Sequence, residues 1–258
     1  MKSKQVMLTA APALLAALVL IVTPGCDGIK GVGPGAEPLR SPYGERRVWA
    51  VAPFRNESGS THADGAVFAD HLARQLEGAS NIDVMPVNRV IAAMSALRIA
   101  ELASPEDVAA VRRALNADAI IVGTISAYDP YDPPKLGVAV ELYADPRRAS
   151  YDAPLDIRQL QRAATGDDAA LPDQPGPRGG ATNVVSAFLD AADPAVRERM
   201  VRYATRRGPV VEANEDAARR YRISMDLYQE FAGYVVSWRL LHAESQRLAR
   251  AHPQPDTR

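Results

Sequence analysis

A largely apolar run near the middle of the chain places the strongest constraint on its fold. Residues 117–127 read ADAIIVGTISA, and the run contains several β-branched side chains. Such a run is typical of a strand buried on both faces, and these strands occur in sheets that helices cover. The sequence therefore predicts an α/β fold. Gly123, at the centre of the run, predicts that a helix packs close to this strand.

Segments with strand and helix patterns alternate around this run. Turn residues bound the short β-branched segments, and the helical segments repeat apolar residues at helical spacing. Ser104, followed by Pro105 and two acidic residues, marks a helix start. The expected strands are 47–54, 82–87 and 136–143, and the expected helices are 64–77, 87–99 and one beginning at Ser104. Residues 46–144 are therefore predicted to form an α/β domain, a small mixed sheet with helices packed on it.

The pattern changes after residue 144. Residues 145–182 are rich in Pro, Gly, Asp and Arg, and they are predicted to be an irregular linker or insert. Residues 183–251 are predicted to be a helical C-terminal region, with helices at 183–189 and 194–204 and one long helix at 215–251. The long helix carries an apolar stripe that includes Phe231 and Trp238. This stripe either packs on the chain's own sheet, which is favoured, or forms a docking face for a partner.

The first 25 residues have the layout of a secretory signal peptide. Lys2 and Lys4 precede an apolar run that ends at the string TPGC, which contains the chain's only cysteine, Cys26. The run is shorter than the roughly 20 apolar residues that a spanning helix needs. Residues 26–45, dense in Gly and Pro, are predicted to be a flexible tether. An ordinary signal peptide with a chance cysteine and an uncleaved anchor are the alternatives.

The string TPGC resembles the lipobox of bacterial lipoproteins, in which a membrane peptidase cuts before a cysteine that carries diacylglycerol. The resemblance implies that Cys26 is the lipid attachment site, with palmitate among its acyl groups. It also implies that the chain is anchored in the bacterial cell envelope and faces the periplasm. Asp27 resembles a signal for retention in the inner membrane, but the choice between inner and outer membrane stays open.

A second resemblance covers residues 47–143. The strings VAPFRNESG and LNADAIIVGTISAY, with a leucine-containing helix between them and a hairpin after them, resemble the amino-terminal half of the curli-secretion lipoprotein domain. Similar units occur in the penicillin-binding-protein activator lipoproteins and in the amino-terminal domain of the Tol system's propeller protein. In this family the chain normally adds a further strand that ends in a Thr-Gly turn. Here only residues 164–166, Ala-Thr-Gly, are recognisable as part of such a strand. The membrane-spanning hairpins of a secretion channel are missing, so the resemblance implies no pore activity.

Residues with the chemistry of a catalytic or metal site are few. The histidines show no metal-ligand spacing, so neither a metal nor a cofactor is predicted; they are His62, His71, His242 and His252. Ser58 lies outside a G-x-S-x-G motif, and with Asn56 it is expected to satisfy the backbone of a turn. No catalytic residue is therefore predicted.

Two further segments could contact partners. Asp129 and Asp132, in the string DPYDPP, are expected to form a hairpin turn, and the neighbouring Tyr128 and Tyr131 are candidate partner-binding residues. Residues 197–222 contain eight arginines and four acidic residues. This stretch is interpreted as a solvated helix face, with contact to anionic headgroups or wall polymers as the alternative.

The charge balance gives no electrostatic case for nucleic acid as a partner, because 30 Lys and Arg face 31 Asp and Glu. The sequence thus favours a non-enzymatic, membrane-anchored periplasmic lipoprotein that binds a cell-envelope protein or assists assembly. An envelope hydrolase with an unidentified site is one alternative. A structural subunit of a homo-oligomeric, secretion-type assembly is the other.

Overall fold

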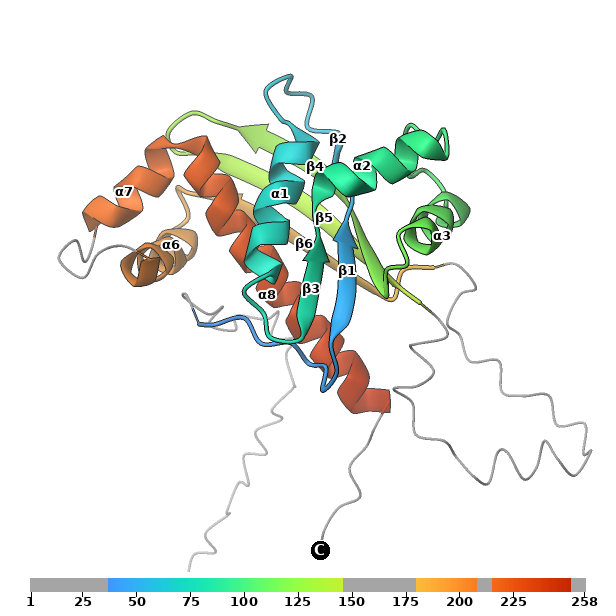
Figure 1. Ribbon diagram of the computed structural model, residues 1–258. Helices are drawn as coiled ribbons and strands as arrows, with labels where there is room; N and C mark the ends of the chain where they lie inside the picture. Colours follow the sequence, from blue (N-terminus) through green and yellow to red (C-terminus); the bar gives the residue numbers. More distant parts are fainter. Residues whose placement is uncertain (1–36, 146–179, 208–214, 252–258) are drawn as a thin grey trace, which may run out of the picture. The chain divides into compact units, whose positions relative to one another are not determined.

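The computed structural model describes residues 37–145, 180–207 and 215–251 (Figure 1). The predicted signal peptide, Cys26 and most of the predicted insert at 145–182 lie outside these residues. The described residues form the predicted α/β structure, in which helices pack on a mixed sheet and a long helix ends the chain's described part.

The sheet has the strand order β3-β1-β4-β5-β6, and the short strand β2 pairs with β4. Its parallel part is formed by β3, β1, β2 and β4, whereas β4, β5 and β6 pair antiparallel. The strands are β1 (Arg47–Val51), β2 (Arg55–Asn56), β3 (Ile82–Met85), β4 (Ala119–Asp129), β5 (Lys135–Ala144) and β6 (Asn183–Asp190). The predicted antiparallel hairpin of β4 and β5 is confirmed.

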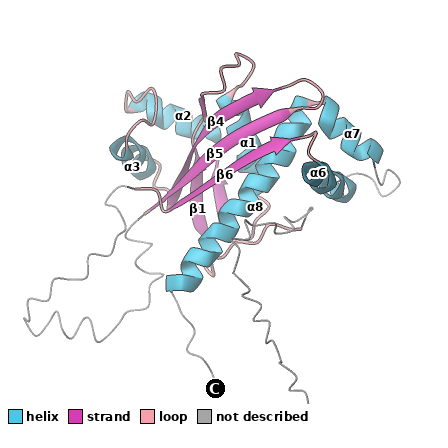
Figure 2. Ribbon diagram, turned by 180° about the vertical axis from the view of Figure 1, so that it is seen from behind, coloured by secondary structure: helices cyan, strands magenta, loops and turns pink. Residues whose placement is uncertain are grey.

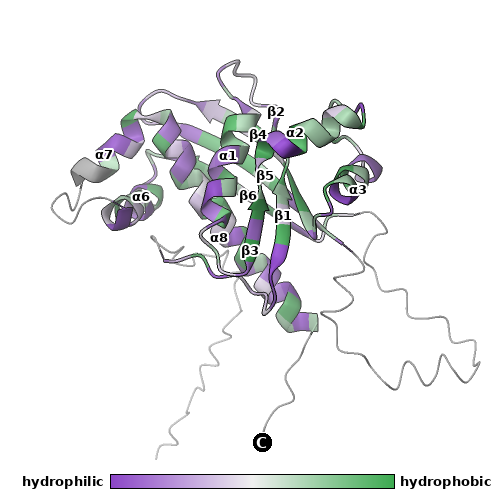
Figure 3. Ribbon diagram, in the orientation of Figure 1, coloured by the Kyte–Doolittle hydropathy of each residue, from purple (hydrophilic) through white to green (hydrophobic). Residues whose placement is uncertain are grey.

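The predicted central strand is confirmed as β4, which is buried on both faces over its first half. Ile120 and Ile121 each have no exposed surface, and they belong to two different core clusters on opposite faces of the sheet. The apolar strands stand out in Figure 3 against more hydrophilic helix surfaces. Burial of adjacent residues on both faces explains why the run shows no polar alternation.

Each face of the sheet has its own helices. One core cluster includes residues of α1 (Gly65–Leu76), α6 (Pro194–Arg207), α7 (Glu215–Ile223) and α8 (Met225–Ala251). The other includes residues of α2 (Val87–Ala96) and α3 (Pro105–Ala114) against β1, β3 and the start of β4. Seen from behind, β4, β5 and β6 lie in front of α1 and α8, and no described helix covers that side of β5 and β6 (Figure 2).

Local signals in the sequence explain where several elements begin. The Asp64 carboxylate accepts hydrogen bonds from Ala66 N and Val67 N at the start of α1. Ser104 Oγ accepts one from Asp107 N at the start of α3, as predicted. These side chains satisfy backbone N–H groups that have no partner inside the helix.

The turn after β1 and β2 also has the predicted role. Asn56 donates to the carbonyls of Ser60 and Ala63, and its side-chain oxygen accepts a hydrogen bond from Ser58 N. The polar residues of this turn therefore hold its own backbone in place.

Two predicted helices are wrong. Residues 183–189 form strand β6, which pairs along β5 from Lys135 to Leu142 and supplies the returning strand that the sequence did not reveal. The single helix predicted at 215–251 is divided into α7 and α8. Ser224 lies between them, and its hydroxyl accepts a hydrogen bond from Leu227 N in the first turn of α8.

Residues 37–45, which the sequence assigns to the tether, are attached to the fold. Leu39 is buried in the core beside α8 residues, and Tyr43 donates a hydrogen bond of 2.7 Å to the fully buried Glu244. Asn81 Nδ2 donates to the Tyr43 carbonyl at 3.0 Å. This part of the predicted tether is thus an ordered strap across the domain.

The close approach at Gly123 has a different partner from the one predicted. A Cβ atom at this position would lie 2.2 Å from Cε1 of Phe54, so the neighbour is an aromatic ring and not a helix. Phe54 is buried and packs edge-on against Phe68 at a ring distance of 4.9 Å.

Candidate functional site

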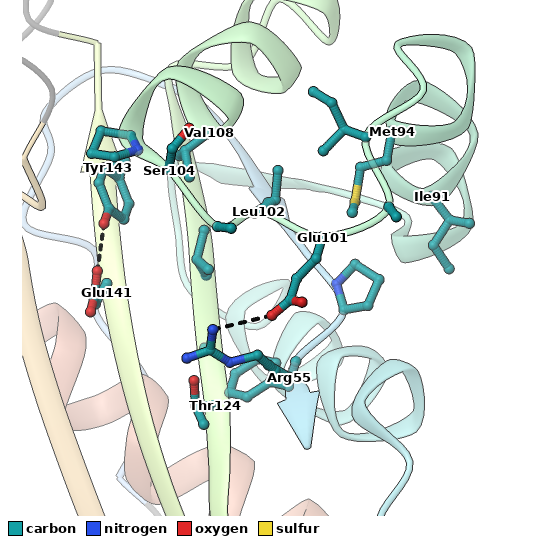
Figure 4. Close-up of a pocket in the computed structure, with 18 of the residues that line it drawn as sticks. Arg55, Ile91, Met94, Glu101, Leu102, Ser104, Val108, Thr124, Glu141 and Tyr143 are labelled. Carbon is teal, nitrogen blue, oxygen red and sulfur yellow. Dashed lines mark hydrogen bonds and ion pairs between the residues drawn. The ribbon is translucent and has the colours of Figure 1, made fainter. Parts of the chain in front are cut away.

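A groove of about 970 Å³ lies between the open side of the sheet and the connection from α2 to α3 (Figure 4). Its sheet wall is formed by Val122 and Thr124 of β4 and by Ala139, Glu141 and Tyr143 of β5. Strand geometry explains this set, because alternate residues of a strand point to the same face. The groove exists because α2 and α3 cover only part of that face.

The opposite wall of the groove comes from α2, the following loop and the start of α3. Ile91 and Met94 project from α2, and Leu102 and Val108 from the loop and α3. Ile91 keeps 43% of its surface exposed. This wall therefore presents apolar side chains, as is usual for sites that bind other molecules.

Of the four charged side chains that line the groove, Arg55, Glu101 and Glu141 have charged or hydroxyl partners, and Arg98 is exposed. Arg55 is ion-paired with Glu101 at 3.1 Å and with Glu57 at 2.5 Å. The Tyr143 hydroxyl donates a 2.5 Å hydrogen bond to Glu141. Burial, with the adjacent Glu141 carboxylate, raises the pKa of Tyr143 to about 12, so this hydroxyl keeps its proton at neutral pH. Tyr143 is therefore not a candidate general base at neutral pH.

The open face continues from the groove onto strand β6. Val184 pairs with Glu141, and Phe188 pairs with Gly137, so both side chains stand on the groove's side of the sheet. Val184 is 64% exposed and Phe188 is 63% exposed, whereas the intervening Ala187 is buried against the other face. We call Val184, Phe188 and the sheet wall of the groove the open face.

The residues proposed from the sequence for partner binding are not brought together. Tyr131 is 75% exposed in the β4–β5 turn, and Tyr128 is half-buried against the core. Phe231 is 1% exposed and lies in the core, in agreement with the favoured interpretation of the stripe on α8. Trp238 is half-buried and stacks on the His242 ring at 5.0 Å. Cys26 lies outside the described residues.

Asp129 acts within the β4–β5 turn as the sequence predicts, whereas Asp132 makes a contact with a distant helix that the sequence did not predict. Asp129 accepts a hydrogen bond from Tyr131 N, and Asp132 forms a two-pronged ion pair with Arg222 of α7 at 3.1 Å. Hydrogen bonds from Arg222 lower the pKa of Asp132.

His71 is buried between two charged side chains. Arg74 contacts Nδ1 at 2.9 Å, and Asp226 contacts Nε2 at 3.0 Å. Because a guanidinium can only donate, Nδ1 accepts and the neutral ring donates through Nε2–H to Asp226. Burial lowers the pKa of His71. The ring therefore links α1 to α8 as a neutral group.

The described residues offer neither a metal-ligand cluster nor a membrane-spanning helix. In the described part of the chain, no three His, Cys, Asp or Glu side chains are grouped closely enough to hold a metal ion. Each helix within residues 37–145, 180–207 and 215–251 is too short or too polar to cross a membrane.

No known family model and no curated protein matches this sequence. Among solved structures, the chain is similar to the C-terminal domain of LpoB from Escherichia coli, with 10% identity over 61% of this chain and 90% of that one, at a TM-score of 0.36. A lipoprotein from Neisseria meningitidis is 14% identical over 56% of this chain and 80% of that one, at a TM-score of 0.34. PelC from Paraburkholderia phytofirmans is 18% identical over 42% of this chain and 67% of that one, at a TM-score of 0.25. Likenesses this distant do not identify a shared function.

Proposed function

We propose that this chain is a lipid-anchored lipoprotein of the bacterial cell envelope that binds a protein partner and catalyses no reaction. Cys26, at the end of the apolar leader, would carry the lipid, and the domain would face the periplasm. The anchor would concentrate the domain at one membrane, where the open face could meet its partner.

The open face is the observation that carries this proposal. Two large apolar side chains, Val184 and Phe188, are each more than half exposed on the outward side of one strand, with the exposed Ser186 between them. Val184 pairs with Glu141 on the sheet wall of the groove, so the exposed side chains of β6 extend the face of the sheet on which the groove lies. Contiguous apolar surface of this kind marks interaction sites on soluble proteins. An apolar surface of an envelope protein is the complementary ligand.

The proposal is tested by replacing both residues with a charged one. In Val184→Asp/Phe188→Asp, the domain should stay folded because neither side chain is in the core, with a small fall in melting temperature from aspartate in a strand and from the Glu141 carboxylate opposite position 184. Partner binding should weaken by at least about a hundredfold in Kd, since each apolar side chain contributes about 1.5–3 kcal/mol when a partner buries it. Ile223→Asp is the matched control, because Ile223 is 63% exposed on α7, away from the open face.

The readout is chemical crosslinking in whole envelopes followed by capture of this chain. The adducts of wild type and Ile223→Asp should be the same, and the double variant should lose them. Equal adducts in all three would rule out the open face as the docking surface. A change in size on a calibrated column, with no second protein present, would instead favour the homo-oligomeric alternative.

The anchor is tested separately. Cys26→Ser should leave the precursor without lipid and remove the mature protein from the detergent phase of a two-phase extraction. Retention of the variant in that phase would mean that another segment anchors the chain. This result would refute the assignment of Cys26 and leave the open face to be judged by the crosslinking result.

A further inference from the structure

The ordered strap fixes the place where the anchored chain would leave the domain. Tyr234 of α8 donates a 3.0 Å hydrogen bond to the carbonyl of Glu37, and Leu39 and Tyr43 hold the following residues. Only residues 27–36 then lie between Cys26 and the held segment. At about 3.6 Å per residue, this length reaches at most about 40 Å. If Cys26 carries the lipid, this length sets the greatest distance between the membrane surface and Glu37.

The place where Glu37 is held lies beside the C-terminal turn of α6, which carries Arg206 and Arg207. Tyr203 of α6 packs against Tyr234 at a ring distance of 4.9 Å, and the Arg207 guanidinium lies 5.0 Å from the centre of the Tyr203 ring. Burial raises the pKa of the Tyr234 hydroxyl, as does the Glu37 charge, and the charges of Arg206 and Arg207 oppose that rise. Tyr234 therefore lies beside both Glu37, where the held segment begins, and the arginines at the end of α6.

Helix α7 adds arginines to this part of the surface. Tyr221 packs edge-on against Tyr203 at 5.5 Å, which brings the second half of α7 beside the end of α6. Arg206, Arg219 and Arg220 are exposed there, and Arg207 is partly exposed while it pairs with Glu230. Figure 3 shows α6 mainly in hydrophilic colours. We call Arg206, Arg219 and Arg220 the basic end.

We propose that the basic end contacts anionic lipid headgroups when the chain is anchored through Cys26. This inference rests on the proposed anchor and deepens it, because it names the surface that meets the membrane. Charge complementarity supports it, and each arginine held near an anionic surface strengthens association by about fivefold. The effect acts only within a Debye length of about 8 Å, so the basic end must face the membrane surface for the arginines to contribute.

The test uses the mature lipidated chain in phosphatidylcholine vesicles that contain or lack phosphatidylglycerol. A single donor fluorophore is placed at Thr205→Cys on α6 or, as the control, at Glu106→Cys on α3; both positions are exposed. The Cys26 thiol is already occupied by lipid, so labelling is specific. Energy transfer to an acceptor in the headgroup region reports the distance of each helix from the membrane.

Phosphatidylglycerol should at least double the transfer from position 205, leave the transfer from position 106 nearly unchanged, and lose its effect in high salt. Arg219→Glu/Arg220→Glu should abolish the increase. The control variant Arg89→Glu/Arg113→Glu changes the net charge equally on exposed positions of α2 and α3 and should keep it. Melting temperatures confirm that both variants are folded.

Three results would count against the proposed contact or the proposed anchor. Equal transfer from position 205 with and without phosphatidylglycerol in the wild type would overturn the proposal, whatever the variants do. Loss of the increase in the α2 and α3 control would show that net charge, and not the basic end, is responsible. Failure of the wild type to float with either vesicle would refute the anchor itself, which separates that failure from a failure of the basic end.

Discussion

Replacement of Gly123 tests how the sheet packs beneath α1. A Cβ atom at this position would lie 2.2, 2.5 and 2.6 Å from three carbons of the Phe54 ring. These separations are far below van der Waals contact, so the ring must move. Phe54 is 5% exposed and packs edge-on against the fully buried Phe68, which leaves it little room. Gly123→Ala should therefore displace a core ring.

The expected cost follows from two opposing effects. Overpacking a core costs about 1–3 kcal/mol. Alanine in place of glycine inside a strand recovers about 0.5–1 kcal/mol, because the unfolded chain loses conformational freedom. Gly123→Ala should thus lower the free energy of unfolding by about 1 kcal/mol and by at most about 2.5 kcal/mol, and the bulkier Gly123→Val by more.

A double-mutant cycle identifies the ring as the cause. Phe54→Ala alone should cost about 3–5 kcal/mol through the lost ring and the cavity. In that background the new methyl group at position 123 meets no ring, so Gly123→Ala should become neutral or stabilising, a coupling of about 2 kcal/mol. Urea denaturation of the unlipidated Cys26→Ser chain measures all four free energies. Additive costs would refute the contact.

Two other positions give predictions of the same kind. Gly65→Ala should destabilise more than Gly123→Ala, because its Cβ would lie 1.8 Å from the backbone oxygen of Phe54, which cannot rotate away; a smaller fall in melting temperature would contradict this geometry. Burial lowers the pKa of His71 in the folded chain. Below a pH of about 6.5, the pKa of an unfolded histidine, the unfolded chain therefore binds more protons than the folded chain. The free energy of unfolding should therefore fall as the pH drops below about 6.5, and the fall should be smaller in His71→Gln. An equal pH dependence in both proteins would show that a group other than His71 causes the fall.

Much of the fold follows from local signals in the sequence. The caps at Asp64 and Ser104 mark the starts of α1 and α3, and the continuous run around Gly123 marks the central strand. These elements are predictable because the side chains that define them act on their own neighbours. The strap at 37–45 was not predictable, since it depends on contacts with Tyr234 and Glu244, about two hundred residues away in the chain.

Strand β6 was missed for a reason that bears on function. A half-buried strand usually alternates apolar and polar residues. In β6 the inward residues Ala187 and Leu189 are apolar, but so are the outward residues Val184 and Phe188, and the alternation disappears. The same two side chains that obscured the strand form the open face. The break at Ser224 was missed because a serine is tolerated inside helices as well as at their starts.

The most direct test of docking through the open face is site-specific photocrosslinking in living cells. A photoreactive amino acid replaces Phe188 in one strain and Ile223 in another, two exposed apolar positions of equal exposure, 63% each. We expect a discrete adduct with an envelope protein at position 188, lost on adding Val184→Asp, and no such adduct at position 223. Adducts of the same size and yield at both positions, or at position 223 alone, would contradict it.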